Sequence, residues 1–475
     1  MGSGVSADLA AVAPAAEGIG EAAPLSDRWA ETLSQVRQAS KSREKYLDAA
    51  DITELAAAKE EIRRLRSLMT TCFDANDNGV MDFGEVADHV SVENGHHAIA
   101  DLVEKSRPAF EAMVGGVENA AETVFTLGFI ADQDEASRSM EDAAGRENDG
   151  ATYTTAFATA KLTFLGGDGR GGPAYAFDLK EDVLVSVGTH ADDHDKSDRG
   201  AEYSLLEWYG GKLVTACDRT GNVDEIVVDA ARAGGGGGSG GKYVIRPVLG
   251  PDGARVRLTL DGVAKKKGLK TEWSTIKDGV LVVGSTGKER TDDDGNVVHR
   301  GEMWVKALNE SWAVEPRDWS RNYGALRDAA KCPHGSGYMI HEAGRWSDVH
   351  KKWLFFPRKL SRQPYDEVID EAKCCNLMLC CDDAFDATTT IAKPALTFLP
   401  LRGCSDFLYV PGTNDSHLFV IRTEETIDGD VGTFCSVIDL AGKVLMPEVL
   451  FGKGRKFEGC CVIDAFLAAA APAAE

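Results

Sequence analysis

Four glutamates and one serine hold equivalent places in five successive stretches of the chain. In each stretch the residue stands at the head of a short apolar segment, which leads through a turn into a second apolar segment. The five residues are Glu202, Glu272, Glu342, Ser405 and Glu458. Four carboxylates that converged on one point would repel each other strongly. Calcium binds six to eight oxygens and removes such repulsion. The pattern therefore predicts a shared calcium site, and the alternative is that each acid is a solvated strand end.

The spacing of these residues indicates the elements that must position them. They recur about every 50 to 70 residues, and each unit is rich in short strands. Asp-Gly pairs at 252–253, 261–262, 278–279 and 294–295 are typical of hairpin turns. Radial repetition of such units builds β-propellers. We therefore expect a mainly β fold, a five-bladed β-propeller, in which one polar residue of each blade points at the central axis.

A second calcium motif lies before the repeats, between two segments with a helical pattern. Residues 74–85 match an EF-hand loop at its ligand positions. Gly79 permits the sharp turn that the loop needs. The expected ligands are the side chains of Asp74, Asn76, Asn78, Asp82 and Glu85 and the carbonyl of Val80. The loop predicts a second Ca2+ site, and the alternative is an acidic turn between helices.

Composition divides the chain into four parts. Residues 1–48 are rich in Ala, Gly, Ser and Glu without periodicity, which predicts disorder. Residues 49–122 are expected to form a small α-helical EF-hand module, and residues 123–464 the propeller. Residues 124–131 are expected to be its first strand. Residues 465–475 are expected to be a frayed or weakly helical tail.

The charge balance limits the partners of the protein. Lys and Arg total 52 against 76 for Asp and Glu, a net charge of −24, which disfavours nucleic acid and anionic membranes. We find no apolar run long enough for a transmembrane helix and no signal-peptide pattern. The first six residues fit an N-myristoylation pattern, so a weak membrane contact through Gly2 stays open, as does the compartment. The 11 cysteines lack zinc spacing and are expected to be buried thiols.

A series of motifs in one order resembles the apyrase-type soluble calcium-activated nucleotidases. The resemblance runs from about residue 124 to residue 463 and does not cover the EF-hand region. It implies a five-bladed propeller with one calcium ion on its axis, and hydrolysis of nucleoside di- and triphosphates. The motifs stand at 130–138, 218–221, 270–273, 287–289, 304–306, 322–327, 340–342, 346–348, 353–358 and 457–459.

The resemblance also implies which residues bind the axial ion. In the first repeat the ligand is Ser204 through its carbonyl, which leaves Glu202 for the substrate side. Two positions depart from the family: Leu205 replaces an aspartate, and Arg290 replaces an aromatic residue that could stack on a base. The implied ligands are Ser204, Glu272, Glu342, Ser405 and Glu458.

Hydrolysis of a phosphoanhydride needs a metal at the phosphate oxygens, cations for the developing charge, and an acid that orients water. Of the candidate acids, Asp132 or Asp218 is expected to position the attacking water. Any one of these residues alone would more often form a surface ion pair. The candidate acids are Asp132, Asp134, Glu202 and Asp218, and the candidate cations are Arg138, Arg219, Lys288, Arg327 and Arg358.

Two functions of different classes stay open at this point. The first is a calcium-dependent hydrolase of phosphoanhydride bonds, with a nucleoside di- or triphosphate as substrate. The second is a catalytically weak propeller that acts as a calcium-responsive binding module. Charged residues at nearly every motif position favour the hydrolase, because a binding scaffold does not need converging acids and bases. The sequence leaves open the preferred nucleotide and whether the protein forms a homodimer.

Overall fold

The computed structural model describes residues 123–470, with gaps at 142–146, 166–173, 188–200, 229–241, 264–266, 293–295, 387–390 and 427–428. The predicted disordered region, the EF-hand loop and the myristoylation pattern lie outside the described residues. All described residues belong to one compact unit.

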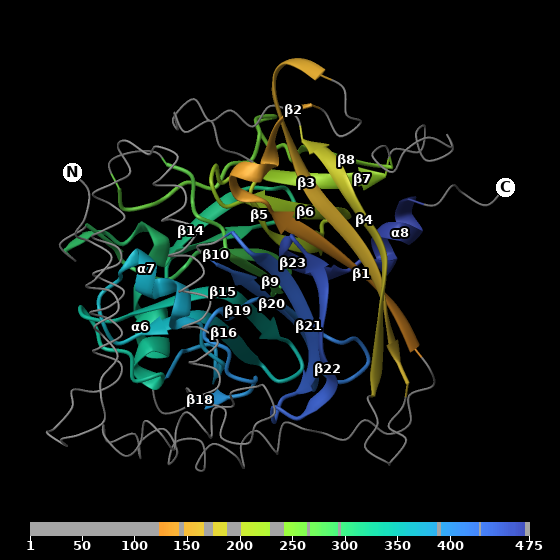
Figure 1. Ribbon diagram of the computed structural model, residues 1–475. Coiled ribbons are helices and arrows are strands. Elements are labelled where there is room, and N and C mark those ends of the chain that lie inside the picture. Colours follow the sequence, from red (N-terminus) through yellow and green to blue (C-terminus); the bar gives the residue numbers. More distant parts are fainter. Residues whose placement is uncertain are drawn as a thin grey trace, which may run out of the picture. The chain divides into compact units, whose positions relative to one another are not determined.

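The described strands form a mainly β, five-bladed propeller arrangement, as the repeats predicted (Figure 1). Each blade has four antiparallel strands. Blade one consists of β23 (Lys456–Val462), β1 (Thr123–Asp132), β3 (Glu147–Phe164) and β4 (Tyr175–Val187). Blade two consists of β5 (Tyr203–Tyr209), β6 (Lys212–Cys217), β7 (Val223–Val228) and β8 (Tyr243–Pro247). Blade three consists of β9 (Trp273–Lys277), β10 (Val280–Gly284), β13 (Trp304–Leu308) and β14 (Val314–Asp318).

The last two blades follow the same plan. Blade four consists of β15 (Tyr338–Ser347), β16 (Lys352–Ser361), β17 (Leu377–Cys381) and β18 (Ile391–Pro394). Blade five consists of β19 (Arg402–Tyr409), β20 (His417–Glu425), β21 (Val431–Asp439) and β22 (Val444–Lys453). The remaining elements are β2 (Arg138–Glu141), β11 (Arg290–Thr291), β12 (Val297–His299), η2 (Asp134–Ser137), η4 (Gly301–Met303), η5 (Glu371–Lys373), α6 (Ser320–Ala329), α7 (Glu367–Asp370) and α8 (Asp464–Ala470).

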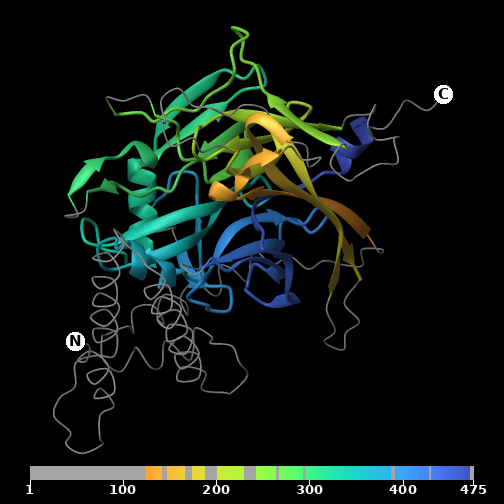
Figure 2. The same cartoon turned by 45° about the horizontal axis from the view of Figure 1, so that its top comes forward.

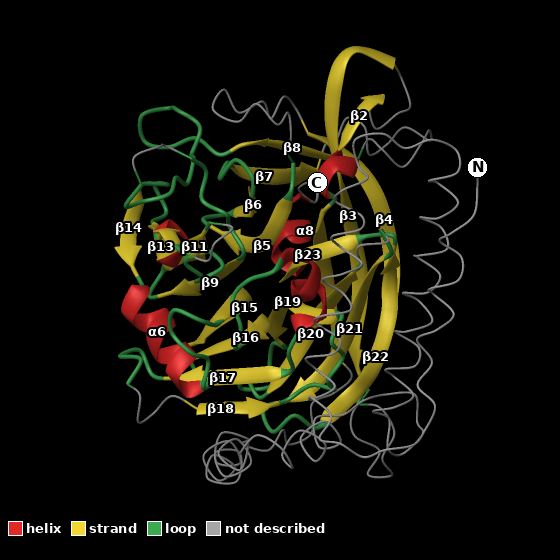
Figure 3. Ribbon diagram, turned by 60° about the vertical axis from the view of Figure 1, so that its left-hand side comes forward, coloured by secondary structure: helices red, strands yellow, loops and turns green. Residues whose placement is uncertain are grey.

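The ring of blades closes by pairing the two ends of the propeller sequence. Strand β23 pairs antiparallel with β1, so blade one combines the last strand with the first. Five hydrophobic clusters fill the structure, one at each interface between neighbouring blades. Figure 3 shows the innermost strands β5, β9, β15, β19 and β23 around the centre, and successive members of this ring contact each other. The apolar side chains buried between neighbouring blades therefore hold the five innermost strands around one central axis.

The hairpins that the sequence predicted are present. The four expected strand pairs are β5–β6, β9–β10, β15–β16 and β19–β20. The first strand, expected at 124–131, is β1. The first residues of the expected C-terminal tail are helical, one of the two expected forms: they belong to α8, the helix nearest the C-terminus in Figure 2. Phe466 of α8 is buried against Trp208, and this packing stabilises the helix.

Two further expectations concern membranes and thiols. None of the helices in the described part of the chain has the length and apolar character that a membrane crossing needs. The cysteines among residues 123–470 are free thiols, and all but Cys375 are buried, as the sequence predicted.

We expect Phe457→Ala to lower the free energy of unfolding by about 3 to 5 kcal/mol, the usual cost of emptying a buried aromatic site. Phe457 lies on the closing strand β23, is 0% exposed, and stacks on Phe451 with ring centroids 5.5 Å apart. Urea unfolding measures the change. Val298→Ala is the control, because Val298 is 61% exposed on β12. Equal stability of the two variants would contradict closure through β23.

Candidate active site

The five residues expected on the axis all belong to the innermost strands or directly precede one. Glu272 comes immediately before β9, and its backbone N–H donates to Gly284 O at 2.9 Å. Glu342, Ser405 and Glu458 each stand at a register shift in the pairing of their strand. Ser204 lies within a similar shift of β5. Such β-bulges re-aim a side chain out of the regular alternation, so these inner strands can present one oxygen-bearing residue each at the same level.

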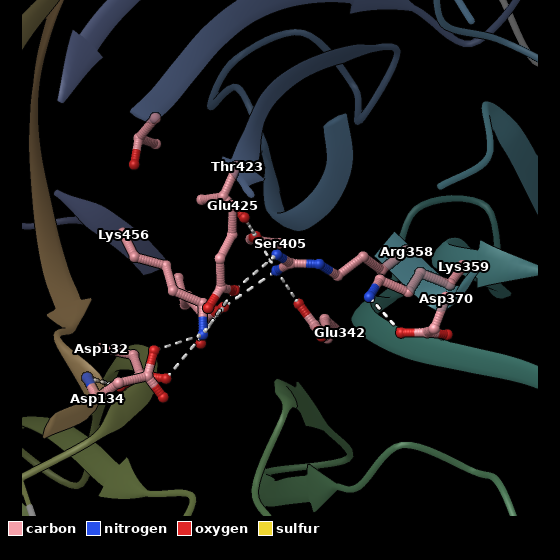
Figure 4. Close-up of polar contacts among 12 residues, drawn as sticks. Asp132, Asp134, Glu342, Arg358, Lys359, Asp370, Ser405, Thr423, Glu425 and Lys456 are labelled. Carbon is pink, nitrogen blue, oxygen red and sulfur yellow. Dashed lines mark hydrogen bonds and ion pairs between the residues drawn. The ribbon is translucent and has the colours of Figure 1, made fainter. Parts of the chain in front are cut away.

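Arg358 of β16 links three of these residues (Figure 4). Its Nη1 donates to Glu342 Oε2 at 2.5 Å, to Ser405 Oγ at 3.0 Å and to Glu458 Oε1 at 3.1 Å. These three residues come from blades four, five and one. Their polar groups therefore meet at one point although they are far apart in the sequence.

Three further acids lie beside this group. Asp132 ends β1, Glu202 precedes β5, and Asp218 follows β6. Each offers a carboxylate oxygen, and these oxygens lie within 4.8 Å of one another. All three residues are buried. Sequence analysis placed them together as candidate acids, and the fold brings them together.

Two lysines connect the acid triplet to the axial residues. Lys456 Nζ lies 2.9 Å from Asp132 Oδ2 and 3.3 Å from Glu458 Oε1. Lys270 Nζ lies 2.7 Å from Asp218 Oδ2 and 2.6 Å from Glu272 Oε1. The axial residues and the triplet are therefore two parts of one charged site.

Burial, lysines and neighbouring carboxylates shift the pKa values of the acids in this site. Burial, with repulsion from neighbouring carboxylates, raises the pKa of Glu272 well above its usual range and that of Glu458 to about 8. Burial also raises the pKa of Asp218, although Lys270 opposes this. Asp132 differs, because Lys456 and a backbone N–H outweigh its burial and lower its pKa. An added cation would relieve the repulsion that raises these values.

The donor set fits calcium. The oxygens are hard ligands on five strands, which suits the high and flexible coordination number of this ion. The buried Ser204 Oγ has no hydrogen-bond partner within the described residues, so Ser204 has a hydroxyl oxygen to offer besides the carbonyl that the resemblance implies as the ligand. Carboxylates also outnumber cations in the site. The acids are Asp132, Glu202, Asp218, Glu272, Glu342 and Glu458, and the cations are Lys270, Arg358 and Lys456.

Comparison with known proteins agrees with this geometry. The sequence profile of the apyrase family matches residues 141–463. The chain belongs to the apyrase family. Over 261 residues it is 36% identical to the soluble calcium-activated nucleotidase 1 of Rattus norvegicus, which covers 55% of this chain and 58% of that protein. Over 263 residues it is 36% identical to an apyrase of Cimex lectularius, which covers 55% and 65% of the two chains.

The match has limits that bear on function. The alignment with this chain spans 58% of the length of the rat relative, and 58% of the length of the soluble calcium-activated nucleotidase 1 of Mus musculus. Among solved structures, a Synechocystis apocarotenoid oxygenase covers 73% of this chain and 66% of its own, at 9% identity and a TM-score of 0.22. A likeness of that size supports no statement about fold or chemistry.

The remaining candidate catalytic residues of this apyrase-family chain differ in how close they lie to the acid triplet. Asp134 begins η2, and its side chain lies 3.6 Å from Lys456. Arg219 follows Asp218 in the turn after β6 and is half-buried. Arg138 begins β2, and its side chain is outside the described part of the structure. Asp134 therefore stands beside the acid triplet through Lys456, and Arg219 is its neighbour along the chain.

Lys288 and Arg327 do not join the axial group. Lys288 lies in the loop after β10, with Nζ 3.9 Å from the ring centroid of Tyr365. Arg327 is buried in α6, where it pairs with Glu289 at 2.7 Å and donates to two backbone carbonyls. The contacts of Arg327 hold the loop after α6, which is a structural role.

Sequence reasoning missed Lys270 and Lys456 as site residues. Both stand two positions before a glutamate of the axis, Glu272 and Glu458, so in extended chain each pair lies on the same side. A search for Lys-x-Glu at the head of a repeat would have found both lysines.

Proposed function

We propose that this protein is a calcium-dependent apyrase that hydrolyses nucleoside di- and triphosphates by attack of water on the terminal phosphate. The observation that carries the proposal is the surplus of buried carboxylates over cations where five innermost strands meet. Family membership and the names of the relatives support it. Ser204, Glu272, Glu342, Ser405 and Glu458 would hold the ion. When bound, calcium would supply positive charge to the phosphate oxygens.

The chain's own residues divide the remaining tasks. Lys456 stands beside the acid triplet, and Arg219 follows Asp218 along the chain, so both are candidates to bind phosphate oxygens by charge-assisted hydrogen bonds. Asp218 suits proton acceptance, because its raised pKa brings it closer to neutral pH. Asp132 suits orientation of the attacking water, because its lowered pKa keeps it ionised and Lys456 fixes its position. Glu202 completes the triplet on the substrate side.

Phosphate release tests the proposal against the binding-module alternative. The purified protein is incubated with UDP, GDP or ATP, first with millimolar calcium and then with excess chelator. We expect release with calcium and its loss with chelator for at least one nucleotide. Nucleotide binding without release, measured by calorimetry on the same sample, would favour the binding module.

The EF-hand loop at 74–85 is a further proposal, on residues outside the described part of the structure. Its ligands come from one continuous loop, whereas the axial ligands come from different blades, so the two calcium events should be separable. We expect Glu85→Gln to remove one calorimetric calcium event, while saturating calcium still supports hydrolysis. A folded Glu85→Gln protein that is inactive at millimolar calcium would contradict two independent sites.

The calcium concentration for half-activation shows whether the EF-hand regulates hydrolysis. If the two sites are coupled, loss of Glu85 shifts the calcium concentration for half-activation, because coupling is a shared free energy. If the loop only buffers calcium, that midpoint stays where it was. A homodimer and an acyl group on Gly2 stay predictions, since no described residue bears on them.

A further inference from the structure

A second polar layer crosses the propeller axis next to the acidic site, and its centre is the guanidinium of Arg345. Nη1 of Arg345 donates to Glu207, and Nη2 donates to Asp406 Oδ2 at 3.0 Å and to Cys460 O at 3.1 Å. Ser274 Oγ donates to Glu207 Oε1 at 3.3 Å. These five residues lie on β5, β9, β15, β19 and β23, so every innermost strand contributes one group.

We call the layer around Arg345 the guanidinium layer, and the five axial residues Ser204, Glu272, Glu342, Ser405 and Glu458 the acidic layer. Each of the five innermost strands contributes one residue to each layer, except that Glu272 directly precedes its strand, β9. On β9 the two contributions are Glu272 and Ser274, and on β23 they are Glu458 and Cys460, two residues apart in each case. The register shifts of β5, β15 and β19 fall at or next to the axial residues of those strands, before the groups that reach Arg345. Each axial residue therefore has a near neighbour in the layer around Arg345, and on β9 this neighbour, Ser274, is linked to Arg345 through Glu207.

The layer is buried and internally satisfied. Arg345 is 8% exposed, and its Nε also donates to Phe407 O. Asp406 accepts a second hydrogen bond from the Cys460 N–H at 2.9 Å. A buried guanidinium with a full set of partners resists displacement, because any movement leaves charged groups unpaired. The layer is therefore rigid without any metal.

A small cavity ends on this layer. Its volume is about 250 Å3, and Glu207, Arg345 and Cys460 are among its lining residues. Trp208, Trp346 and Tyr409 form part of its wall, and no residue of the acidic layer lines it. The guanidinium layer therefore lies between this cavity and the acidic layer.

We propose that Arg345 is a positioning residue for the axial calcium site: a permanent protein cation that fixes the five innermost strands, so that the acidic layer is spaced for calcium before the ion arrives. The inference rests on the proposed function, since it concerns the same ion. Preorganised ligands bind more tightly because less ordering is required at the moment of binding. Groups that orient metal ligands commonly change metal affinity by 10- to 100-fold.

The test is calcium binding by calorimetry on the full chain carrying Glu85→Gln, so that the axial event is measured alone. Arg345→Met by itself leaves two buried acids unpaired and can prevent folding. The informative variant is Arg345→Met combined with Glu207→Gln and Asp406→Asn, which removes all three charges together. We expect its calcium Kd to rise at least about tenfold. Arg345→Lys keeps the charge without the fork of donors and should fall between this variant and the parent.

The control is Arg422→Met with Glu448→Gln, which removes an Arg–Glu pair of β20 and β22, away from the axis. Arg402, the other partner of Glu448, keeps its pair with Glu424. Arg422 is 3% exposed, and its Nε donates to Glu448 Oε2 at 2.7 Å. Its calcium Kd should stay within about twofold of the parent, even where both variants lose similar melting temperature. A folded triple variant with the parent's Kd would overturn the inference alone. A parent chain that binds no calcium would overturn the proposed function and the inference with it.

Discussion

Replacing Glu272 or Glu342 with glutamine is expected to abolish calcium-dependent phosphate release and to reduce the stabilisation that calcium gives the fold. Each change removes one negative charge from the group of oxygens that would hold the ion. Calcium at a thousand times its Kd stabilises a protein by about 4 kcal/mol. A tenfold rise in Kd removes about 1.4 kcal/mol of that gain, and a larger rise removes more. Melting temperature with and without calcium reports the loss independently of activity.

Glu315→Gln is the matched control for these two variants. Glu315 is an exposed glutamate on the outer strand β14 of blade three, paired with Arg317 at 3.0 Å. It should keep both the activity and the calcium-induced rise in melting temperature. Full turnover in Glu272→Gln and Glu342→Gln, with an unchanged rise, would show that the ion does not bind at the acidic layer.

Asp132→Asn and Asp218→Asn should give a different result, a fall in kcat of about 10²-fold or more, as expected when a group that transfers a proton or orients water is lost. Both carboxylates stand beside the axial residues and each is paired with a lysine, Lys456 or Lys270. Calcium-induced stabilisation should survive, because neither acid is an expected ligand of the ion. Steady-state kinetics and melting curves on the same preparations separate the two effects.

Two outcomes of this experiment would change the roles given to the three acids of the triplet. If Asp132→Asn and Asp218→Asn both hydrolyse nucleotide at nearly the normal rate, the proton-accepting acid lies elsewhere, and Glu202 is the next candidate. If either variant instead loses its calcium-induced stabilisation, that acid is a ligand of the ion, and the division between axial residues and triplet is wrong.

Local pattern was enough to predict the repeats. Each strand head stands beside an apolar segment and a turn, and a hairpin needs little more than this information. The number of heads then gave the number of blades. The pairing of β23 with β1, which closes the ring, was not predicted, because it joins segments more than 300 residues apart.

The finer geometry of the site depends on contacts that no local pattern contains. The spacing predicted that these residues point at the axis, but the register shifts at Glu342, Ser405 and Glu458 are set by the partner strands and could not be predicted from it. Lys288 and Arg327 have charges that suit phosphate, and their part in hydrolysis stays a prediction. Their contacts in the structure are with Tyr365 for Lys288, and with Glu289 and two backbone carbonyls for Arg327. Arg345 escaped notice because its partners lie on three other strands and are 61 to 138 residues away along the chain.

Anomalous diffraction from crystals grown with calcium tests the central claim most directly, because it locates the ion without reference to activity. The account predicts a peak within the group formed by Ser204, Glu272, Glu342, Ser405 and Glu458, and loss of that peak in Glu342→Gln. A calcium peak between Asp132, Glu202 and Asp218 with none at the axis, or no peak in the propeller at all, would contradict it.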